Sequence, residues 1–264
     1  MKTKLLNIDA NPKTVKGSAR GYMTAVLYLA PHDSSGIQLC PTANLAGCAA
    51  TCLNTAGRGG MAKGSATFET SSGTVLPDNA IQHARLRRTA FFHQHPVDFM
   101  AQLMREIDAF LAKASRKRKR PAIRLNGTSD IRWEMVPVTR NGKHYPHIFA
   151  AYPRVQFYDY TKIPNRHVTG IANYHLTFSY SGRAEYAPIV VKALRNYSAD
   201  VSFAAVFNGP APEYFLGRPV INGDETDLRF LDRAGVVVAL TAKGRARRDT
   251  SGFVIDTRAA RIAA

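Results

Sequence analysis

The stretch AIRLNGTSD, residues 122–130, carries the pattern that decides the fold: a short apolar segment that ends in a cluster of polar residues. The pattern recurs in the second half of the chain. The other four stretches are RVQFYDYTK (154–162), YHLTFSYSG (174–182), VSFAAVFNG (201–209) and VVVALTAKG (236–244). Short apolar runs bounded by turn residues are typical of buried strands. Together with AVLYLAP (25–31), which ends at a proline, they predict six strands.

Helical patterns lie between several of these strands. The clearest predicted helix covers residues 97–115, and its apolar residues recur at three- and four-residue steps: Met100, Leu103, Met104, Ile107, Phe110 and Leu111. Residues 80–96 and 182–198 also predict helices. Strands that alternate with helices imply a parallel sheet. We therefore predict one α/β domain over residues 1–264 with a mostly parallel sheet. Its form is a partial (β/α)6 barrel, which we favour, or alternatively an open doubly wound sheet.

Both forms place the ligand site at the carboxyl ends of the strands, where the polar clusters lie. We therefore expect one cleft that gathers residues far apart in the sequence. The predicted catalytic residues are Asp130, Tyr160 and Lys162, and the predicted cofactor-binding residues are Asn126, Ser129, Tyr158, Ser179 and Lys243. Alternatively, residues 126–130 form a turn that caps the next helix, and the tyrosines belong to a strand edge.

All three cysteines lie in LCPTANLAGCAATCLNTAGRGG, residues 39–60, with the spacing C-x7-C-x3-C. The chain start has no apolar segment of a secretory signal, which favours a reducing cytoplasm where clustered cysteines bind metal or do redox chemistry. Cys40, Cys48 and Cys52 suit a [4Fe–4S] cluster that leaves one iron open to another ligand. Zinc with a remote fourth ligand, His93 or His95, is an alternative, as are three buried, inert thiols.

This layout resembles the radical SAM enzymes, in which three cysteines follow the first strand of a partial barrel. The resemblance implies a [4Fe–4S] cluster on Cys40, Cys48 and Cys52, and S-adenosylmethionine bound at the open iron. The spacing differs from the usual C-x3-C-x2-C, so the likeness is one of layout. The phrases CPTANLAGCAATCLNTAGRG, RLNGTSDIRWE and FYDYTK also resemble a family of phage and prophage proteins. That likeness implies a protein encoded by a phage or prophage and found in the cytoplasm of its bacterial host.

The charge of the chain points to an anionic partner. Lys and Arg number 36 against 19 Asp and Glu, a net charge of +17. Nucleic acid is the first candidate and an anionic nucleotide the second, and the run RKRKR (116–120) is the only block of like charge. No apolar run reaches about 18 residues, so we expect no membrane span.

Two further segments have alternative interpretations. The acidic stretch INGDETDLRFLD (221–232) could bind Mg²⁺, but we favour a turn ion-paired to Arg229 and Arg233. It belongs to a segment rich in Gly and Pro, residues 207–235, which we expect to hold a long loop near the site.

These observations lead to three hypotheses. The first is an Fe–S metalloenzyme that uses S-adenosylmethionine on a nucleotide or nucleic acid. The second is a zinc-stabilised nucleic-acid-binding protein without catalysis. The third is a metal-dependent nuclease with Tyr158 or Tyr160 as nucleophile and His93 and His95 as metal ligands.

Overall fold

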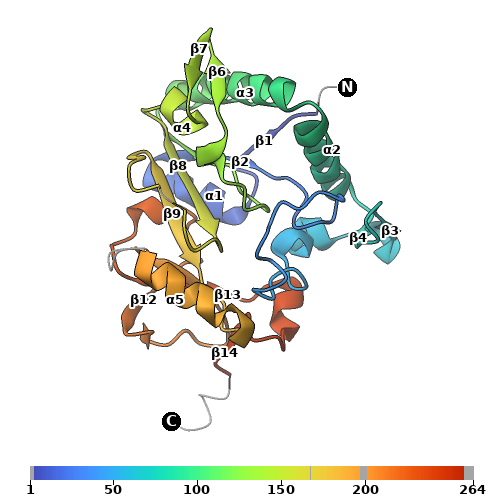
Figure 1. Ribbon diagram of the computed structural model, residues 1–264, viewed down its shortest axis with the longest axis vertical. Coiled ribbons are helices and arrows are strands. Elements are labelled where there is room, and N and C mark those ends of the chain that lie inside the picture. Colours follow the sequence, from blue (N-terminus) through green and yellow to red (C-terminus); the bar gives the residue numbers. More distant parts are fainter. Residues whose placement is uncertain (1–2, 167, 197–200, 259–264) are drawn as a thin grey trace.

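The computed structural model describes residues 3–166, 168–196 and 201–258 (Figure 1). Six strands form the centre of one large sheet, and each overlaps one of the six predicted segments. They are β2 (Tyr22–Leu27), β5 (Arg120–Arg124), β8 (Gln156–Thr161), β9 (Tyr174–Ser179), β10 (Phe203–Asn208) and β13 (Val237–Thr241). Every neighbouring pair among these six is parallel. The predicted α/β fold with a mostly parallel sheet is therefore confirmed.

The six strands lie in the sheet in the order in which they occur in the chain. The full order is β1-β2-β5-β8-β9-β10-β13-β12-β11, and β14 (Ile255–Asp256) also pairs with β10. The outer strands are β1 (Leu6–Ile8), β12 (Arg218–Asn222) and β11 (Tyr214–Phe215). A doubly wound sheet reverses its strand order near the middle, and the six central strands do not. The sheet is open and does not close into a barrel, the form that we favoured; its six central strands follow one another in chain order.

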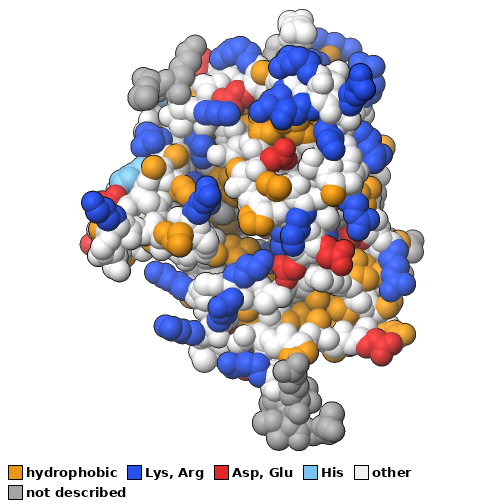
Figure 2. All heavy atoms as spheres, turned by 180° about the vertical axis from the view of Figure 1, so that it is seen from behind, with side chains coloured by type: hydrophobic (Ala, Val, Ile, Leu, Met, Phe, Trp, Pro, Cys, Tyr) orange, Lys and Arg blue, Asp and Glu red, His pale blue; other side chains and the backbone are white. Residues whose placement is uncertain are grey.

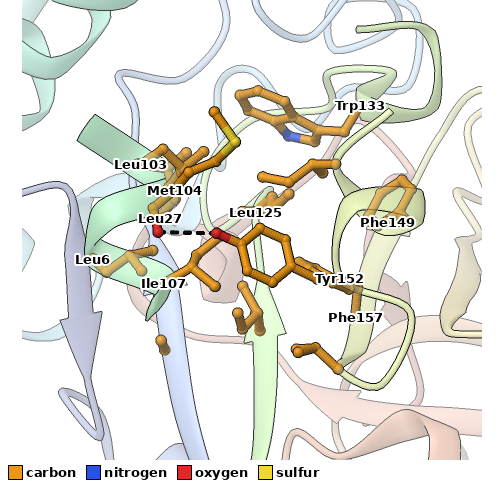
Figure 3. Close-up of a cluster of buried hydrophobic side chains, with 14 of the residues drawn as sticks. Leu6, Leu27, Leu103, Met104, Ile107, Leu125, Trp133, Phe149, Tyr152 and Phe157 are labelled. Atoms are coloured by element: carbon orange, nitrogen blue, oxygen red, sulfur yellow. Dashed lines mark hydrogen bonds between the residues drawn. The ribbon is translucent and has the colours of Figure 1, made fainter. Parts of the chain in front are cut away.

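One face of the sheet packs against α3 (Pro96–Arg116), the helix predicted at residues 97–115. Figure 3 shows Leu103, Met104 and Ile107 of this helix pointing into the apolar layer above β2 and β5. The Tyr152 hydroxyl closes the layer by donating a hydrogen bond to the Met104 carbonyl at 3.0 Å. The apolar residues that were predicted to form one stripe of this helix face the sheet and are buried, which stabilises the helix. Among them only Leu111 stays partly exposed.

The other helices and two small hairpins lie in the connections between strands (Figure 1). The helices are α1 (Pro12–Gly17), α2 (Ala80–Gln94), α4 (Ile148–Ala151) and α5 (Ala187–Asn196). The hairpins pair β3 (Thr67–Glu69) with β4 (Val75–Pro77), and β6 (Val138–Arg140) with β7 (Lys143–Tyr145). Helix α5 packs Val190 and Ala193 against Phe178 and Phe203 of the sheet. It covers much of the helix predicted at residues 182–198, of which the last two residues lie outside the described residues.

The opposite face of the sheet has its own small core, which contains Tyr158. This side chain is fully buried with Tyr22, Ala122 and Leu228, and its ring lies 5.6 Å from the ring of Phe230. Leu228 and Phe230 come from the segment 207–235, which was expected to be a long loop. The structure shows that this segment forms β11, β12 and the 3₁₀ turn η7 (Arg229–Leu231), and that it covers this face of the sheet.

The basic run 116–120 lies at the amino end of β5. Arg116 ends α3, and Arg120 begins β5 with its guanidinium 4.1 Å from the centre of the Tyr22 ring. Among the described residues, no helix is both long and apolar enough to cross a membrane.

Candidate functional site

A cavity of about 240 Å³ lies at the carboxyl ends of the parallel strands. The predicted residues that line it are Cys40, Cys48, Cys52, Asn126, Ser129, Asp130, Tyr160, Lys162, Ser179 and Lys243. Tyr158 is the exception, because it points from β8 into the small core described above. The expectation that residues far apart in the sequence share one cleft is met by the fold, since neighbouring parallel strands end at the same edge of the sheet.

The three cysteines reach the cavity from the long loop that follows β2. None is in a disulfide, and all three are partly exposed. The backbone N–H of His32 donates a hydrogen bond to Cys40 Sγ at 3.3 Å, and Cys40 Sγ lies 3.8 Å from the Thr128 carbonyl oxygen. The first cysteine is therefore attached to the end of β5 as well as to its own loop.

Helix α2 holds the turn that carries Cys52. Asn54 donates its backbone N–H to Cys52 Sγ at 3.5 Å. The Gln82 amide donates to the carbonyl oxygens of Asn54 and Gly59 at 3.0 and 2.7 Å, and accepts from Asn54 Nδ2 at 2.9 Å. Arg85 donates to the same Asn54 carbonyl at 2.8 Å. These buried contacts hold the glycine-rich turn in place. The sequence did not indicate that Gln82 and Arg85 have this role.

Gly59 shows how tightly this turn is packed. A Cβ at this position would lie 2.5 Å from the Asn54 carbonyl oxygen, closer than two such atoms can approach. Glycine is therefore required here by close backbone contact.

The partial burial of the three thiols disfavours their thiolate forms. Loss of solvent raises the pKa of all three, that of Cys52 to about 11. For Cys40 the charges of the other two sulfurs and of Asp130 raise the pKa further, whereas the Lys162 ammonium opposes the rise at Cys48. A group that binds thiolates here would have to displace their protons, as metal ions and iron–sulfur clusters do.

The three thiols and the two histidines of the zinc hypothesis are the candidate ligands for a metal or a cluster. In the described part of the chain, no three His, Cys, Asp or Glu side chains are arranged to hold a single metal ion. His93 and His95, the proposed remote zinc ligands, are exposed where α2 meets α3 and do not line the cavity. The three thiols line one cavity, and thiolates are usual ligands of both zinc and iron–sulfur clusters.

Hydrogen bonds to the Asn126 side chain hold residues 126–131 in a bent stretch, but no side chain caps the 3₁₀ turn that follows (Trp133–Met135), so the alternative of a helix-capping turn holds only in part. Asn126 Oδ1 accepts from Ser129 Oγ and the Ile131 N–H, both at 2.9 Å, and from Trp133 Nε1 at 3.2 Å. Gly127 lies so close to β2 that a Cβ would stand 2.6 Å from the Leu27 carbonyl oxygen. The stretch shapes the cavity wall, and the side-chain oxygen of Asn126 is occupied by internal hydrogen bonds.

Asp130 is buried and bound on both of its oxygens. Oδ2 accepts from the Lys162 backbone N–H at 2.8 Å, and Oδ1 lies 3.3 Å from Arg166 Nη1. Arg166 is itself held by Glu134 and Tyr174. Burial raises the pKa of Asp130, and the Arg166 charge opposes that rise. In this geometry the Asp130 carboxylate holds the start of the loop after β8.

Lys162 brings a positive charge to the cavity without a carboxylate partner. Its ammonium donates to the Ser179 carbonyl and hydroxyl, both at 3.0 Å, and to the Tyr180 carbonyl at 3.3 Å, and it lies 4.7 Å from the centre of the Phe253 ring. None of the ion pairs in the described residues includes it. Burial lowers its pKa, and the nearby Cys48 and Asp130 act in the opposite direction. The position of Lys162 suits an anionic group of a ligand.

Tyr160 lies on the same side of β8 as Lys162. Its hydroxyl is 3.4 Å from Asp227 Oδ1, and the Arg124 guanidinium lies 4.8 Å from its ring centre. Arg124 also pairs with Asp227 at 2.9 Å. Tyr160, Arg124 and Asp227 therefore form a small group in the cavity wall. The sequence pattern did not indicate that Arg124 and Asp227 belong to the site.

The acidic stretch is ion-paired, as favoured, but mainly with partners that the sequence did not indicate. Asp224 lies 2.9 Å from both Lys13 of α1 and Lys243. Although burial favours its neutral form, these two lysines hold the pKa of Asp224 well below its usual range. Asp232 pairs with Arg229 at 3.2 Å, as expected, whereas Arg233, the other expected partner, is in none of the ion pairs of the described residues. Lys13 and Asp224 line the cavity, and nothing in the pattern around Lys13 distinguishes it from other surface lysines.

These features define an α/β protein with an open, mostly parallel sheet and a cysteine-lined cavity at the carboxyl ends of its strands. The chain matches the gene product 88 family over residues 3–257 and belongs to that family. The match fits the resemblance to phage proteins seen in the sequence. No curated protein and no solved structure matches the chain.

Proposed function

We propose that this protein is an iron–sulfur enzyme similar in layout to the radical SAM enzymes. In this proposal Cys40, Cys48 and Cys52 hold a [4Fe–4S] cluster, and the cavity beside them holds S-adenosylmethionine. The observation that carries the proposal is the position of the three free thiols. They come from the loop after the first of six sequential parallel strands and line the same cavity as the ends of the other strands. A reducing cytoplasm would keep these thiols free.

The residues of the cavity have distinct roles in this proposal. Bound together, the cluster and S-adenosylmethionine would supply one-electron chemistry. Lys162 would attract an anionic group, Lys243 would line the cavity while paired with Asp224, and the Ser179 hydroxyl would hydrogen-bond the cofactor or substrate. Asp130 would keep Lys162 in place through the backbone N–H that it accepts. Asn126 and Ser129 would shape the cavity wall, since their side chains bond to each other.

The charge of the chain favours a nucleotide or nucleic acid as substrate. The net charge is +17, and four cationic side chains line the cavity: Lys13, Arg124, Lys162 and Lys243. Three of these pair with Asp224 or Asp227, so Lys162 is the one whose positive charge no carboxylate in the described residues neutralises. A nuclease that uses Tyr158 or Tyr160 with a histidine pair has less support. Tyr158 is buried, and neither His93 nor His95 lines the cavity.

The test is the metal content of protein purified without oxygen. We expect brown protein with iron and sulfide in roughly equal amounts, about four of each per chain. Each of Cys40→Ala, Cys48→Ala and Cys52→Ala should lose the colour and most of the iron. Leu53→Ala is the matched control, because Leu53 is an exposed residue of the same loop that carries no metal-binding group, and this variant should keep both.

Three results would overturn the proposal. Colourless protein with one tightly bound zinc would instead support the zinc-stabilised nucleic-acid-binding protein. Colourless protein with no metal after anaerobic reconstitution would show that the thiols serve another purpose. Iron that persists in all three cysteine variants would mean that the metal is bound elsewhere.

A further inference from the structure

The only block of like charge in the sequence is on the wrong side of the molecule to serve the cavity. Residues 116–120 lie at the amino end of β5, whereas Arg124 and Asn126 at the other end of the same strand line the cavity. A strand of this length separates the two ends by roughly 13 Å. A ligand that enters the cavity would therefore need basic residues from another part of the chain to guide it.

The 3₁₀ turn η8 (Gly244–Arg248) provides such residues at the edge of the cavity. It directly follows Thr241 and Lys243, which line the cavity, and its buried Ala246 lines the cavity as well. Anchored in this way, the turn exposes three arginines to solvent: Arg245, Arg247 and Arg248. We call these three arginines the η8 rim.

The cysteine loop lies beside the η8 rim. A Cβ on Gly244 would stand 3.5 Å from the Cβ of Ala56, so the two segments are in close contact. Arg58, two residues further along the cysteine loop, is also exposed. The same loop presents the apolar side chain of Leu53, which is 58% exposed and lines the cavity. Figure 2 shows Lys and Arg side chains beside a hollow, on the part of the surface where Figure 1 draws the red segment that contains η8.

The charges of the rim are available to a partner. No ion pair in the described part of the chain includes Arg58, Arg245, Arg247 or Arg248. Lys243, by contrast, is already paired with Asp224. Unpaired arginines side by side suit phosphates, because each guanidinium can donate two parallel hydrogen bonds.

We propose that the η8 rim binds the backbone of single-stranded nucleic acid and directs one nucleotide into the cavity. A base that is stacked and paired in a duplex cannot reach groups on the wall of a cavity, so the bound strand must be single or locally opened. A row of cations beside an exposed apolar residue is suited to such a strand. The idea that the nucleotide is chemically altered rests on the proposed function, but the binding itself does not.

The test compares two variants with the same change in charge. One is Arg245→Gln, Arg247→Gln, Arg248→Gln in the η8 rim. The matched control is Arg116→Gln, Lys117→Gln, Arg118→Gln, three exposed residues at the opposite end of β5. Fluorescence anisotropy with a labelled oligothymidylate of about 20 nucleotides, measured over a range of salt concentrations, reports the affinity and its salt dependence.

We expect the η8 variant to bind at least about tenfold more weakly near physiological salt, with the slope of log K against log salt reduced by about 2, as the loss of three phosphate contacts implies. The control should bind within about twofold of the unchanged protein. The proposal is wrong if the control loses as much affinity as the η8 variant, if a duplex of the same sequence binds as tightly as the single strand, or if no oligonucleotide binds.

A second arm separates this proposal from the proposed function. Cys48→Ala should retain oligonucleotide binding, because Cys48 is not part of the rim. The η8 variant should retain the iron content of the unchanged protein. If the unchanged protein contains no iron but the η8 variant loses oligonucleotide binding, the binding surface is supported and the cluster is rejected. If the unchanged protein contains iron but binds no oligonucleotide, the cluster is supported and the binding surface is rejected.

Discussion

Replacement of Asp130 by Asn tests whether this residue is a structural or a reactive group. The change preserves shape and leaves an oxygen to accept the Lys162 N–H, but it removes the charge that faces Arg166 at 3.3 Å. Removing one partner of a buried ion pair typically costs about 3–5 kcal/mol. Arg166 keeps its contact with Glu134 at 2.9 Å, so we expect a smaller loss, about 2–3 kcal/mol in the free energy of unfolding.

Urea or thermal unfolding followed by circular dichroism measures this loss. For a chain of this size, the expected change corresponds to a decrease in Tm of about 4–12 °C. Glu185→Gln is the control, since it breaks the exposed ion pair with Arg183 and should leave Tm unchanged within error. The reasoning would be refuted by an Asp130→Asn protein that is less than about 1 kcal/mol destabilised and yet loses ligand binding. That result would identify Asp130 as a group that acts on the ligand directly.

Two further predictions concern the cysteine turn and the pH dependence of stability. Gln82→Leu removes the amide that holds Asn54, so it should lower the iron content of anaerobic protein while the chain stays folded; full iron occupancy would show that this contact does not position Cys52. Burial, aided by the Arg229 charge, lowers the pKa of His175 to about 4, below the value of about 6.5 expected when unfolded. His175 is therefore neutral in both states above pH 6.5, and its contribution is lost as the pH falls from about 6.5 to 4, by up to about 1.4 kcal/mol per pH unit. In His175→Gln the fall of stability over this range should be shallower, and an unchanged slope in acid unfolding experiments would contradict the assignment.

The sequence predicted the elements of the fold well because burial leaves a local signal. The strands of a parallel sheet are covered on both faces, so each appears as a short apolar run, and all six were located. The period of apolar residues in α3 was equally clear. Since parallel strands end at one edge of the sheet, the shared position of the cysteines, Asp130 and Lys162 followed from the fold class alone.

The sequence could not predict what the side chains at that edge bind. Tyr158 and Tyr160 are two residues apart on one strand, so they point to the same face and look equivalent in the sequence. In the structure Phe230 covers Tyr158, whereas Tyr160 lines the cavity. Asp130 looked like a free carboxylate because its partner, Arg166, is 36 residues away in the chain.

The sequence by itself determined the six central strands and the helices α2, α3 and α5, and it placed three thiols on the loop after the first of these strands. Only the tertiary structure decided which charges neutralise one another. Lys13 and Lys243 meet at Asp224 across most of the chain, and Arg124 meets Asp227. It also decided that the arginines of η8, and not the basic run 116–120, border the cavity. The physical reason is that hydrophobic periodicity is a property of neighbours in the sequence, whereas an ion pair depends on distances that exist only once the chain has folded.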